Sequence, residues 1–371
     1  MNHLKFDDKL NIAIIIPGGI GTGRNNIGVP ALERIIKLLS VDFNLTVFQL
    51  YPVNENFKVE GFELIDIYST NRALKIIKLF FSFLKAHRRQ RFCVVHGFWI
   101  LPCGFMATLF GKIFKIKSIV SVQGGDAIAL PEIHYGQLQS RLNKKLILWT
   151  LHQADTITAL TQYLIHNLKK SGFRRDDGKI IPFGVDPVLF AFLEKSLQQP
   201  IRFLHIANLH PVKDQETLLK TFQIISNTVP SQLTIVGDGI LKHNITTLIT
   251  KLELKNKVTI LDALPYEELP AYYHKADILL HTSRSEGQGV VVTEAMSCGT
   301  IVCGTRVGLL YDLSDCCVSV PVGDYNLLAE KILQLIQYPE QIKALRQQAH
   351  TWALEHSMMW TVSNIDALYR H

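Results

Sequence analysis

Short apolar runs of strand length alternate with helix-like segments along the whole chain, and this order restricts the possible folds more than any other feature. Strands that are separated by helices pair in parallel through crossover connections. Of the 371 residues, 47% are hydrophobic, which is enough to fill two sizeable cores. The sequence therefore predicts α/β domains with parallel sheets and a ligand cleft at the carboxyl ends of the strands.

Prolines, glycines and a polar run interrupt this pattern in the middle of the chain, around Pro182, Gly184, Pro187 and residues 196–200. Each side is long enough for a core of its own, and the last residues have the spacing of an amphipathic helix. We expect a first domain over 1–183, a linker over 184–199, a second domain over 200–351 and a C-terminal helix over 352–371.

One segment has the pattern of a strand, a turn and a buried helix. The apolar strand 276–281 leads into a turn with Gly287 and Gly289, and residues 290–296 begin the helix. Glycines at a turn can take a positive φ and let a ligand approach the backbone. The free N–H groups at the start of the following helix favour anions, so this turn is a candidate diphosphate site.

Two carboxylates flank this turn. Glu286 lies on the turn and Glu294 lies inside the helix, so one can face a reacting group while the other bonds hydroxyls of the same ligand. The alternative is that Glu286 caps the turn and Glu294 is a solvated helix residue. Two solvated glutamates are unusual within a run this apolar, which favours the functional interpretation.

The segment 283–299 resembles the paired-glutamate motif of the family 4 retaining glycosyltransferases, which have the GT-B fold of two Rossmann-like domains facing across a cleft. The resemblance extends over most of the chain in family order. The other segments that carry it are 11–19, 154–161, 181–190, 203–214, 233–239 and 266–273.

This resemblance implies roles for individual residues. Glu286 would lie near the donor sugar, Glu294 would bond the ribose, and Lys213 would neutralise the departing phosphates. Gln123 stands where the family has a histidine near the donor sugar, and we group it with Glu286 and Lys213 as catalytic. The expected donor-binding residues are Gly19, Asn208, Arg284, Gly287, Gly289, Val290 and Glu294.

The sequence departs from the family pattern at several positions. Asn208 replaces the arginine that binds the diphosphate, so this stabilisation is either lost or supplied from elsewhere, with Arg284 and Arg24 as candidates. Gln123 can hydrogen-bond a sugar but cannot carry a proton as a histidine can. Gln288 and Ile301 also differ from the usual residues, and we expect those two changes to affect packing more than chemistry.

Acceptor-side residues are expected in the first domain. His96 and Trp99 follow a strand and flank a glycine, and a ring nitrogen and an aromatic face are suited to a sugar. Trp99 is equally plausible as a core residue. Asp126, on the loop that begins at Gln123, completes the expected acceptor group.

Charge is divided unevenly: residues 1–182 carry a net +11 and residues 183–371 a net −4. The densest basic segment is 71–92, with seven basic residues and no acidic ones. Its apolar residues Leu74, Ile77, Phe81 and Leu84 share one helical face, and Lys75, Lys78, Lys85 and Arg88 share another. The pattern predicts a helix that contacts an anionic membrane surface, with an ordinary surface helix as the alternative.

Other classes are disfavoured. The chain has no zinc-finger spacing, RNA-binding motif or basic zipper, so we expect no nucleic-acid partner. It contains no Asp-x-Asp triplet, dinucleotide fingerprint or P-loop, so we expect no metal and no cofactor beyond the sugar donor. The six cysteines lack metal or disulfide spacing, the N-terminus is not a signal peptide, and no tract is long enough to span a membrane.

The sequence thus predicts a cytoplasmic retaining hexosyltransferase that is independent of metal, with a peripheral position on the inner face of the membrane as a further hypothesis. It would move a sugar from a nucleotide-diphosphate sugar to an acceptor hydroxyl, with a lipid-linked saccharide in surface or exported polysaccharide synthesis as the expected acceptor. The alternative is a GT-B protein that binds nucleotide or glycan as a non-catalytic partner of an active enzyme. An epimerase or phosphorylase on the same fold is a third, weaker hypothesis.

Overall fold

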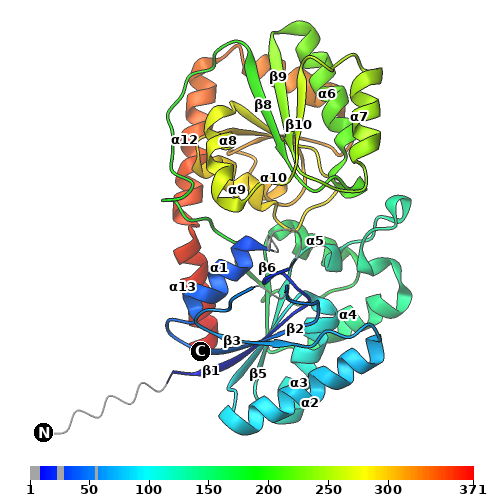
Figure 1. Cartoon of the computed structure of the whole chain (residues 1–371), viewed down its shortest axis with the longest axis vertical. Coiled ribbons are helices and arrows are strands. Elements are labelled where there is room, and N and C mark those ends of the chain that lie inside the picture. Colours follow the sequence, from blue (N-terminus) through cyan, green and yellow to red (C-terminus); the bar gives the residue numbers. More distant parts are fainter. Residues whose placement is uncertain (1–8, 23–28, 55–56) are drawn as a thin grey trace, which may run out of the picture.

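The strands of the protein form two parallel sheets, one in each half of the molecule (Figure 1). The computed structural model describes residues 9–22, 29–54 and 57–371. In this part of the chain the first sheet has seven strands in the order β3-β2-β1-β4-β5-β6-β7, and the second has six in the order β10-β9-β8-β11-β12-β13. The strands of the first sheet are β1 (Asn11–Ile16), β2 (Asn44–Gln49), β3 (Glu63–Asp66), β4 (Val94–Phe98), β5 (Lys117–Val122), β6 (Thr156–Ala159) and β7 (Lys179–Ile180).

Helices cover both faces of the first sheet. On one face, Leu32 and Ile35 pack against Ile14, and on the other, Phe83 and Phe110 pack in a cluster with alternate strand residues such as Ile15. The alternation along β1 places successive isoleucines in different cores. The helices of this half are α1 (Pro30–Leu39), α2 (Arg72–Gln90), α3 (Phe105–Phe114), α4 (Arg141–Gln153) and α5 (Gln162–Lys170).

The second sheet is also enclosed between helices, with α6, α7 and α11 contributing to one core and α8, α9 and α12 to the other. The strands are β8 (Ile201–Ile206), β9 (Ser231–Val236), β10 (Val258–Leu261), β11 (Ile278–His281), β12 (Ile301–Thr305) and β13 (Val318–Val320). The helices are α6 (Gln215–Thr228), α7 (Lys242–Lys251), α8 (Leu269–Lys275), α9 (Val290–Ser297), α10 (Leu309–Asp312), α11 (Tyr325–Leu335), α12 (Pro339–Glu355) and α13 (Met358–Arg370).

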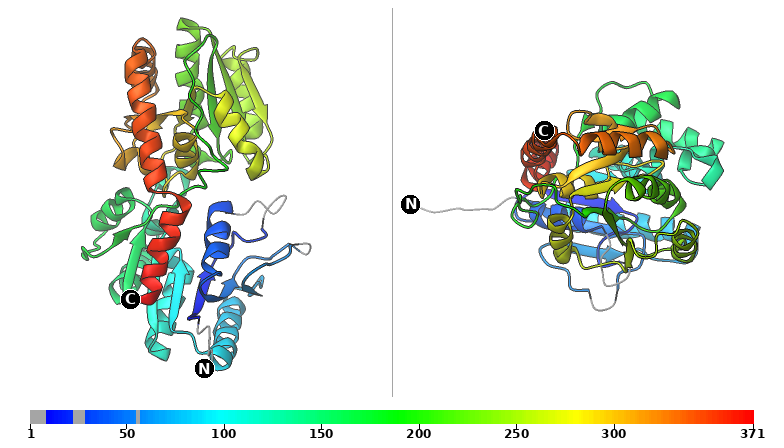
Figure 2. Two further views of the ribbon diagram at one scale, coloured as in Figure 1. Left: turned by 90° about the vertical axis from the view of Figure 1, so that its left-hand side faces the viewer. Right: turned by 90° about the horizontal axis from the view of Figure 1, so that it is seen from above.

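The chain passes between the two halves twice. No helix or strand occurs between β7 and β8, the region of the expected linker. The return is made by α12 and α13, which run along the side of both halves (Figure 2). The segment expected as one helix over 352–371 contains a break: α12 ends at Glu355, and the Ser357 hydroxyl caps α13 by accepting from the Trp360 N–H. This cap lets the chain change direction.

The last helix is anchored on the first half of the molecule. Tyr369 packs edge-on against Phe43, with the ring centres 5.2 Å apart, and its hydroxyl lies 2.9 Å from His96 Nδ1. The Lys117 ammonium donates to the Leu368 carbonyl at 2.9 Å. These contacts tie the C-terminus of the chain to the first sheet.

Both sheets have a switch point where the strand order reverses, between β1 and β4 in the first and between β8 and β11 in the second. The loops after these strands diverge to opposite faces and leave a crevice at the carboxyl edge. Among the described residues, no helix is long and apolar enough to cross a membrane.

Candidate active site

A cleft of about 500 Å³ lies where the loops of both halves meet. Its first wall includes the start of α1 and the loops after β4 and β5, and its second wall includes the loops after β8, β9 and β11 together with α9. From the first half come Val29, Pro30, Ala31, Trp99, Gln123, Leu160 and Phe183; from the second come Asn208, Lys213, Tyr266, Glu286, Gly287, Gly289, Val290 and Glu294, among others.

Lys213 and Glu286 form an ion pair at this cleft, although 73 positions separate them in the sequence. Lys213 follows β8 and Glu286 follows β11, and these two strands are neighbours at the switch point of the sheet. The Glu286 side chain is 10% exposed and the Lys213 side chain 22% exposed. The pair therefore presents a held cation and a held carboxylate to the cleft.

Two residues that the sequence analysis did not single out hold Glu286. The Ser283 hydroxyl donates to its carboxylate at 2.6 Å, and His281 Nε2 lies 3.4 Å from the same oxygen. Burial alone would raise the pKa of Glu286, but the Lys213 ammonium and the Ser283 hydroxyl hold that pKa below its usual value. Burial lowers the pKa of His281 to about 4, so its ring is neutral. Glu286 is thus a carboxylate at neutral pH.

Glu294 has a different environment. It is 2% exposed, and the Tyr273 hydroxyl donates to it at 2.6 Å. Burial raises the pKa of Glu294 to about 7, because a charged carboxylate is poorly solvated there and no ion pair to Glu294 occurs among the described residues. Tyr273 comes from α8 and could not be recognised from the motif itself, because its contact with Glu294 depends on how α8 packs on α9.

The start of α9 opens directly into the cleft. Gly289 precedes the helix in a left-handed conformation with φ 82°, and no side chain caps this end. Val290 and Val291, the first helical residues, both line the cleft. Unpaired N–H groups and the helix dipole favour an anion at this position.

The loop with Gly287 touches the first half of the molecule. A Cβ on Gly287 would fall 1.8 Å from the Gln123 carbonyl oxygen, so only glycine fits there. The Thr161 hydroxyl donates to the Gly287 carbonyl at 2.7 Å. The two walls of the cleft are therefore in direct contact at this point.

Gln288 forms a second link, which differs from the packing role that we expected. Its amide carbonyl accepts from the Phe183 N–H at 2.7 Å, and its amide nitrogen donates to the Phe183 carbonyl at 2.7 Å. Gln288 is 2% exposed, so these bonds are shielded from water. An aromatic residue could not make both bonds, and the amide thus fixes the start of the linker to the motif loop.

The structure contradicts the acceptor roles of His96 and Asp126. His96 is fully buried in β4, between the Tyr369 hydroxyl at 2.9 Å and the Ser121 hydroxyl at 2.7 Å. Asp126 is 1% exposed, and its carboxylate accepts from the N–H groups of Ile100 at 2.9 Å and Gly124 at 2.7 Å. Both residues fix the loops after β4 and β5. The polar atoms of both side chains are therefore occupied by hydrogen bonds within the protein.

Trp99 and Gln123 do line the cleft. Trp99 has φ 66°, uncommon for a non-glycine residue, and its N–H donates to the Ser121 carbonyl at 2.9 Å. The bend lets the indole meet the cleft where β4 ends. An acceptor role for Trp99 and a catalytic role for Gln123 stay predictions.

Three donor-side predictions fare differently. Arg284 is not among the residues that line the cleft, and its Nε lies 3.4 Å from Asp214, so it does not replace the missing arginine there. Gly19 is not among the residues that line the cleft, and its carbonyl accepts from the Val29 N–H at 2.9 Å. Asn208 lines the cleft with an exposed side chain. Arg24 lies outside the described residues.

Helix α2 presents an apolar and basic surface away from the cleft. Leu74, Ile77 and Phe81 are 55%, 50% and 62% exposed, while Leu79 and Phe83 are buried in the core. The neighbouring α3 and α4 also lack acidic residues, and the rings of Phe105 and Trp149 join them at 5.4 Å. The helix predicted over residues 71–92 is confirmed as α2, and three of the four residues of its predicted apolar face are exposed.

Two enzyme-family models match this chain. Residues 46–189 match the model described as Glycosyltransferase Family 4, and residues 192–352 match that of the Glycosyl transferases group 1. Together they cover the strands from β3 to β13, most of β2 and most of the linker, and they leave out β1. The chain is a GT-B protein and belongs to this glycosyltransferase family, as the sequence motifs predicted.

Particular proteins show the range of the similarity. The N-acetyl-alpha-D-glucosaminyl L-malate synthase of Bacillus anthracis is 26% identical over 279 residues, which cover 71% of this chain and 70% of that protein. The amylovoran biosynthesis glycosyltransferase AmsK of Erwinia amylovora is 28% identical over 50% of this chain and 48% of its own. The Anabaena HepE structure in complex with UDP-glucose superposes with a TM-score of 0.76 at 17% identity, covering 97% of this chain and 99% of that one.

Proposed function

We propose that this protein transfers a sugar from a nucleoside-diphosphate sugar to an acceptor hydroxyl with retention of anomeric configuration. The observation that carries the proposal is the convergence of Lys213, Glu286, Glu294 and the uncapped start of α9 on one cleft. The complex of HepE with UDP-glucose, a protein of the same fold, supports a nucleotide-sugar donor.

In the proposed reaction the diphosphate binds at the start of α9, and Lys213 leaves Glu286 for the phosphate oxygens. The acceptor oxygen attacks the anomeric carbon on the face from which the phosphate departs. The glycosyl–phosphate bond breaks with its electron pair on the phosphate, which then takes the acceptor proton. Fixed positive groups stabilise the charge that grows on the leaving diphosphate. No protein nucleophile is needed.

The two glutamates would have different roles in binding the donor. Glu286, an ionised carboxylate beside Ser283, can orient the donor sugar through its hydroxyls and favour positive charge on the anomeric carbon. Glu294 can accept hydrogen bonds from ribose hydroxyls at the deeper end of the cleft. Among the described residues, no cluster of three or more histidine, cysteine or acidic side chains is arranged to hold a metal ion. We propose that Lys213 and α9 meet the diphosphate directly.

Calorimetry with UDP, GDP and ADP, repeated with Glu294→Ala and Lys213→Ala, tests the donor site. We expect one nucleotide to bind the parent protein with micromolar affinity and both variants to bind it more weakly. The corresponding nucleotide sugars are then assayed for hydrolysis and transfer. If none of the three nucleotides binds, the proposal of a donor site is wrong.

The replacement of a cleft arginine by Asn208 keeps a second function open, that of a non-catalytic nucleotide-binding partner. Arg284 does not restore the missing charge in the cleft, since it faces Asp214. Donor hydrolysis separates the two functions: an enzyme releases sugar slowly in the absence of acceptor, whereas a pure binder retains intact donor. The ion pair of Lys213 and Glu286 favours the catalytic function over the non-catalytic one.

We further propose that the acceptor is a lipid-linked saccharide for a surface or exported polysaccharide, reached from the cytoplasmic side of the membrane. The exposed Leu74, Ile77 and Phe81 of α2, with basic residues around them, are suited to anionic headgroups. The name of the AmsK relative, an amylovoran biosynthesis enzyme, supports a polysaccharide product.

Co-sedimentation with vesicles tests the membrane contact. We expect detergent-free protein to bind vesicles that contain phosphatidylglycerol, and Ile77→Ser with Phe81→Ser to abolish this binding. Ile240→Ser removes a more exposed apolar side chain of the second domain and is the control. Equal binding by the α2 double variant and the control would exclude α2 as the contact.

A further inference from the structure

The first turn of α5, a helix of the first domain, lies against the second domain (Figure 1). The helix begins at Gln162 and packs on α10, which ends at Asp312. The ring centres of Tyr163 and Tyr311 are 5.5 Å apart at this contact. The start of α5 also bonds the turn that carries Glu286. Three segments therefore meet beside the cleft: the start of α5, α10 and this turn.

A carboxylate of the second domain caps this helix of the first. Asp312 accepts from the Gln162 N–H at 2.7 Å and from the Tyr163 N–H at 3.0 Å. The first N–H groups of a helix have no partner within the helix, and a negative charge is favourable at that end. The residue before a helix often supplies such a bond, but Thr161, which precedes α5, uses its hydroxyl elsewhere. The cap of α5 thus depends on contact between the two domains.

Side chains at the start of α5 hold both neighbours of Glu286. The Thr161 hydroxyl donates to the Gly287 carbonyl at 2.7 Å, and the Tyr163 hydroxyl donates to the Ser285 hydroxyl at 3.3 Å. Thr161 is fully buried and Ser285 is 4% exposed, so water competes little for these bonds. The backbone on either side of Glu286 is therefore held in part from the first domain.

Within the second domain, α10 and the same turn form one surface. The Leu309 N–H donates to the Gln288 carbonyl at 3.0 Å. A Cβ on Gly308 would lie 2.8 Å from the Glu286 Cβ and 2.5 Å from the Gln288 carbonyl oxygen, so α10 begins in close contact with the turn. The start of α5 can thus bond both α10 and the turn only when the two domains are in contact.

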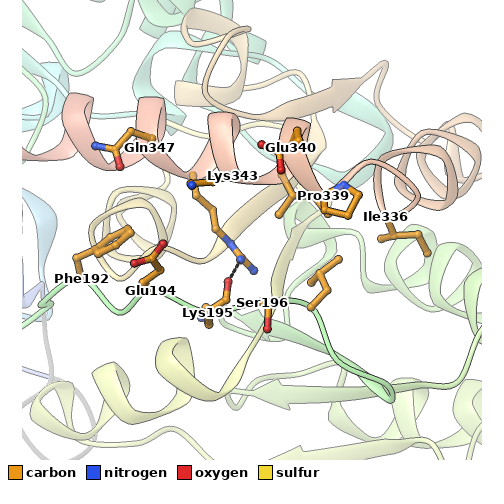
Figure 3. A pocket seen from close by; sticks show the side chains of 12 residues that line it. Phe192, Glu194, Lys195, Ser196, Ile336, Pro339, Glu340, Lys343 and Gln347 are labelled. Atoms are coloured by element: carbon orange, nitrogen blue, oxygen red, sulfur yellow. Dashed lines mark hydrogen bonds between the residues drawn. The ribbon is translucent and has the colours of Figure 1, made fainter.

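The linker is fixed to the second domain at another place. Arg346 of α12 donates to the Lys195 carbonyl of the linker, beside a pocket of about 600 Å³ (Figure 3). The residues around this pocket, such as Phe192 and Glu194, all differ from those that line the cleft. This part of the linker is therefore held on α12, whereas the start of α5 is held on the turn itself.

We propose that Asp312 and Thr161 are positioning residues for Glu286, which act by docking α5 on α10 and on the turn. This inference rests on the proposed transfer reaction. The groups expected to hold the nucleotide, Glu294 and the start of α9, belong to the second domain and do not require α5. The orientation of Glu286 towards the donor sugar does require it. A displacement of about 1 Å at a reacting group can slow a reaction about a hundredfold.

Transfer rates and nucleotide affinity, measured in the same variants, test this role. We expect Asp312→Ala and Thr161→Val to lower kcat at saturating donor at least about tenfold. The calorimetric Kd for whichever of UDP, GDP and ADP binds the parent should be unchanged. Thr161→Ser keeps the hydroxyl and should retain the parent's kcat, and Asp312→Asn, which keeps one acceptor oxygen, should give an intermediate kcat.

Asp324→Ala is the matched control. Asp324 also caps a helix, since it accepts from the Leu327 N–H at 3.0 Å, but this helix is α11 and the cap lies within the second domain. The control should lose some stability and keep the parent's kcat. A loss of kcat in Asp324→Ala as large as in Asp312→Ala would contradict the proposed role, because the effect would then follow from lower stability.

Hydrogen exchange of α5 tests the docking without reference to activity. We expect the amides of Gln162 and Tyr163 to exchange faster in Asp312→Ala than in the parent, and at the parent's rate in Asp324→Ala. The inference is wrong if these amides exchange equally fast in the parent and in Asp312→Ala, if kcat is unchanged in both Asp312→Ala and Thr161→Val, or if nucleotide affinity falls in parallel with kcat. If the parent transfers no sugar, the proposed function is wrong, and the exchange rates still decide whether Asp312 docks α5.

Discussion

At the scale of single residues, the sequence identified the chemical groups of the site but not their environments. Glu286 and Glu294 were recognised from one short motif, since strand, turn and helix are local patterns. Their charges depend on partners elsewhere: Lys213 lies after another strand, and Tyr273 lies on another helix. The structure thereby makes one glutamate an ion-paired carboxylate and gives the other a pKa of about 7.

Removal of the cation should slow the reaction strongly. We expect Lys213→Ala to lower kcat for transfer by about a hundred- to a thousandfold, because the leaving diphosphate loses a fixed positive group. Lys220→Ala is the matched control, since Lys220 is also ion-paired but lies on the exposed face of α6. Initial rates of nucleotide release at saturating donor measure the effect. A loss of less than about tenfold would argue against leaving-group stabilisation by Lys213.

Glu294 should make stability depend on pH. Its folded-state pKa of about 7 lies above the model-compound value of 4.5, so the unfolded chain releases this proton first as the pH rises. The contribution of Glu294 to stability is therefore lost as the pH rises from about 4.5 to 7, and it amounts to at most about 3 kcal/mol. Glu294→Gln lacks this loss and should gain stability relative to the parent over that range. Urea unfolding at pH 5 and pH 8 measures the difference, and an equal difference at both pH values would contradict the assignment.

At the scale of elements, the order of strands and helices followed from the sequence, whereas the contacts between loops did not. The turn glycines were expected to admit a ligand, yet Gly287 is also required by the Gln123 carbonyl from the other domain. Gln288 looked like a packing substitution because its partner, the backbone of Phe183, has no side-chain signal in a sequence. Similarly, the break before α13 rests on a single serine cap.

The substitution Gly287→Ala should push apart the two walls of the cleft. Since the Cβ of Gly287→Ala would lie 1.8 Å from the Gln123 oxygen, we expect a loss of about 1–3 kcal/mol in stability together with weaker transfer. Gly178→Ala is the control, because its Cβ would meet only the end of the Ile165 side chain, at 3.3 Å. Thermal unfolding and transfer rates are compared. Full activity in Gly287→Ala would show that this contact is dispensable.

At the scale of the whole molecule, both domains contain neutral histidines that resist protonation. Burial lowers the pKa of His96 to about 3 and those of His205 and His281 to about 4. His96 belongs to the first sheet and the other two to the second, so a low pH should destabilise both halves of the molecule. His96 also bonds Tyr369 of α13, which couples the C-terminus to the first core.

We expect stability to fall as the pH drops below 6.5. The unfolded chain takes up protons on these three histidines from about pH 6.5 downward, while the folded chain does not. Each contributes about 1.4 kcal/mol per pH unit, and Glu294 offsets one of the three between pH 7 and 4.5. Denaturant midpoints measured from pH 7 to pH 5 should therefore decrease. A constant or rising midpoint would show that the histidines are not neutral in the folded state.

The sequence by itself determined the succession of strands and helices, the family motif and the apolar and basic faces of α2, because each depends on the spacing of neighbouring residues. The tertiary structure alone decided which polar groups meet. It paired Lys213 with Glu286 and buried His96 while leaving Trp99 at the cleft. Burial and hydrogen-bond partners depend on segments that are distant in the chain, and no local pattern records which of these segments will pack together.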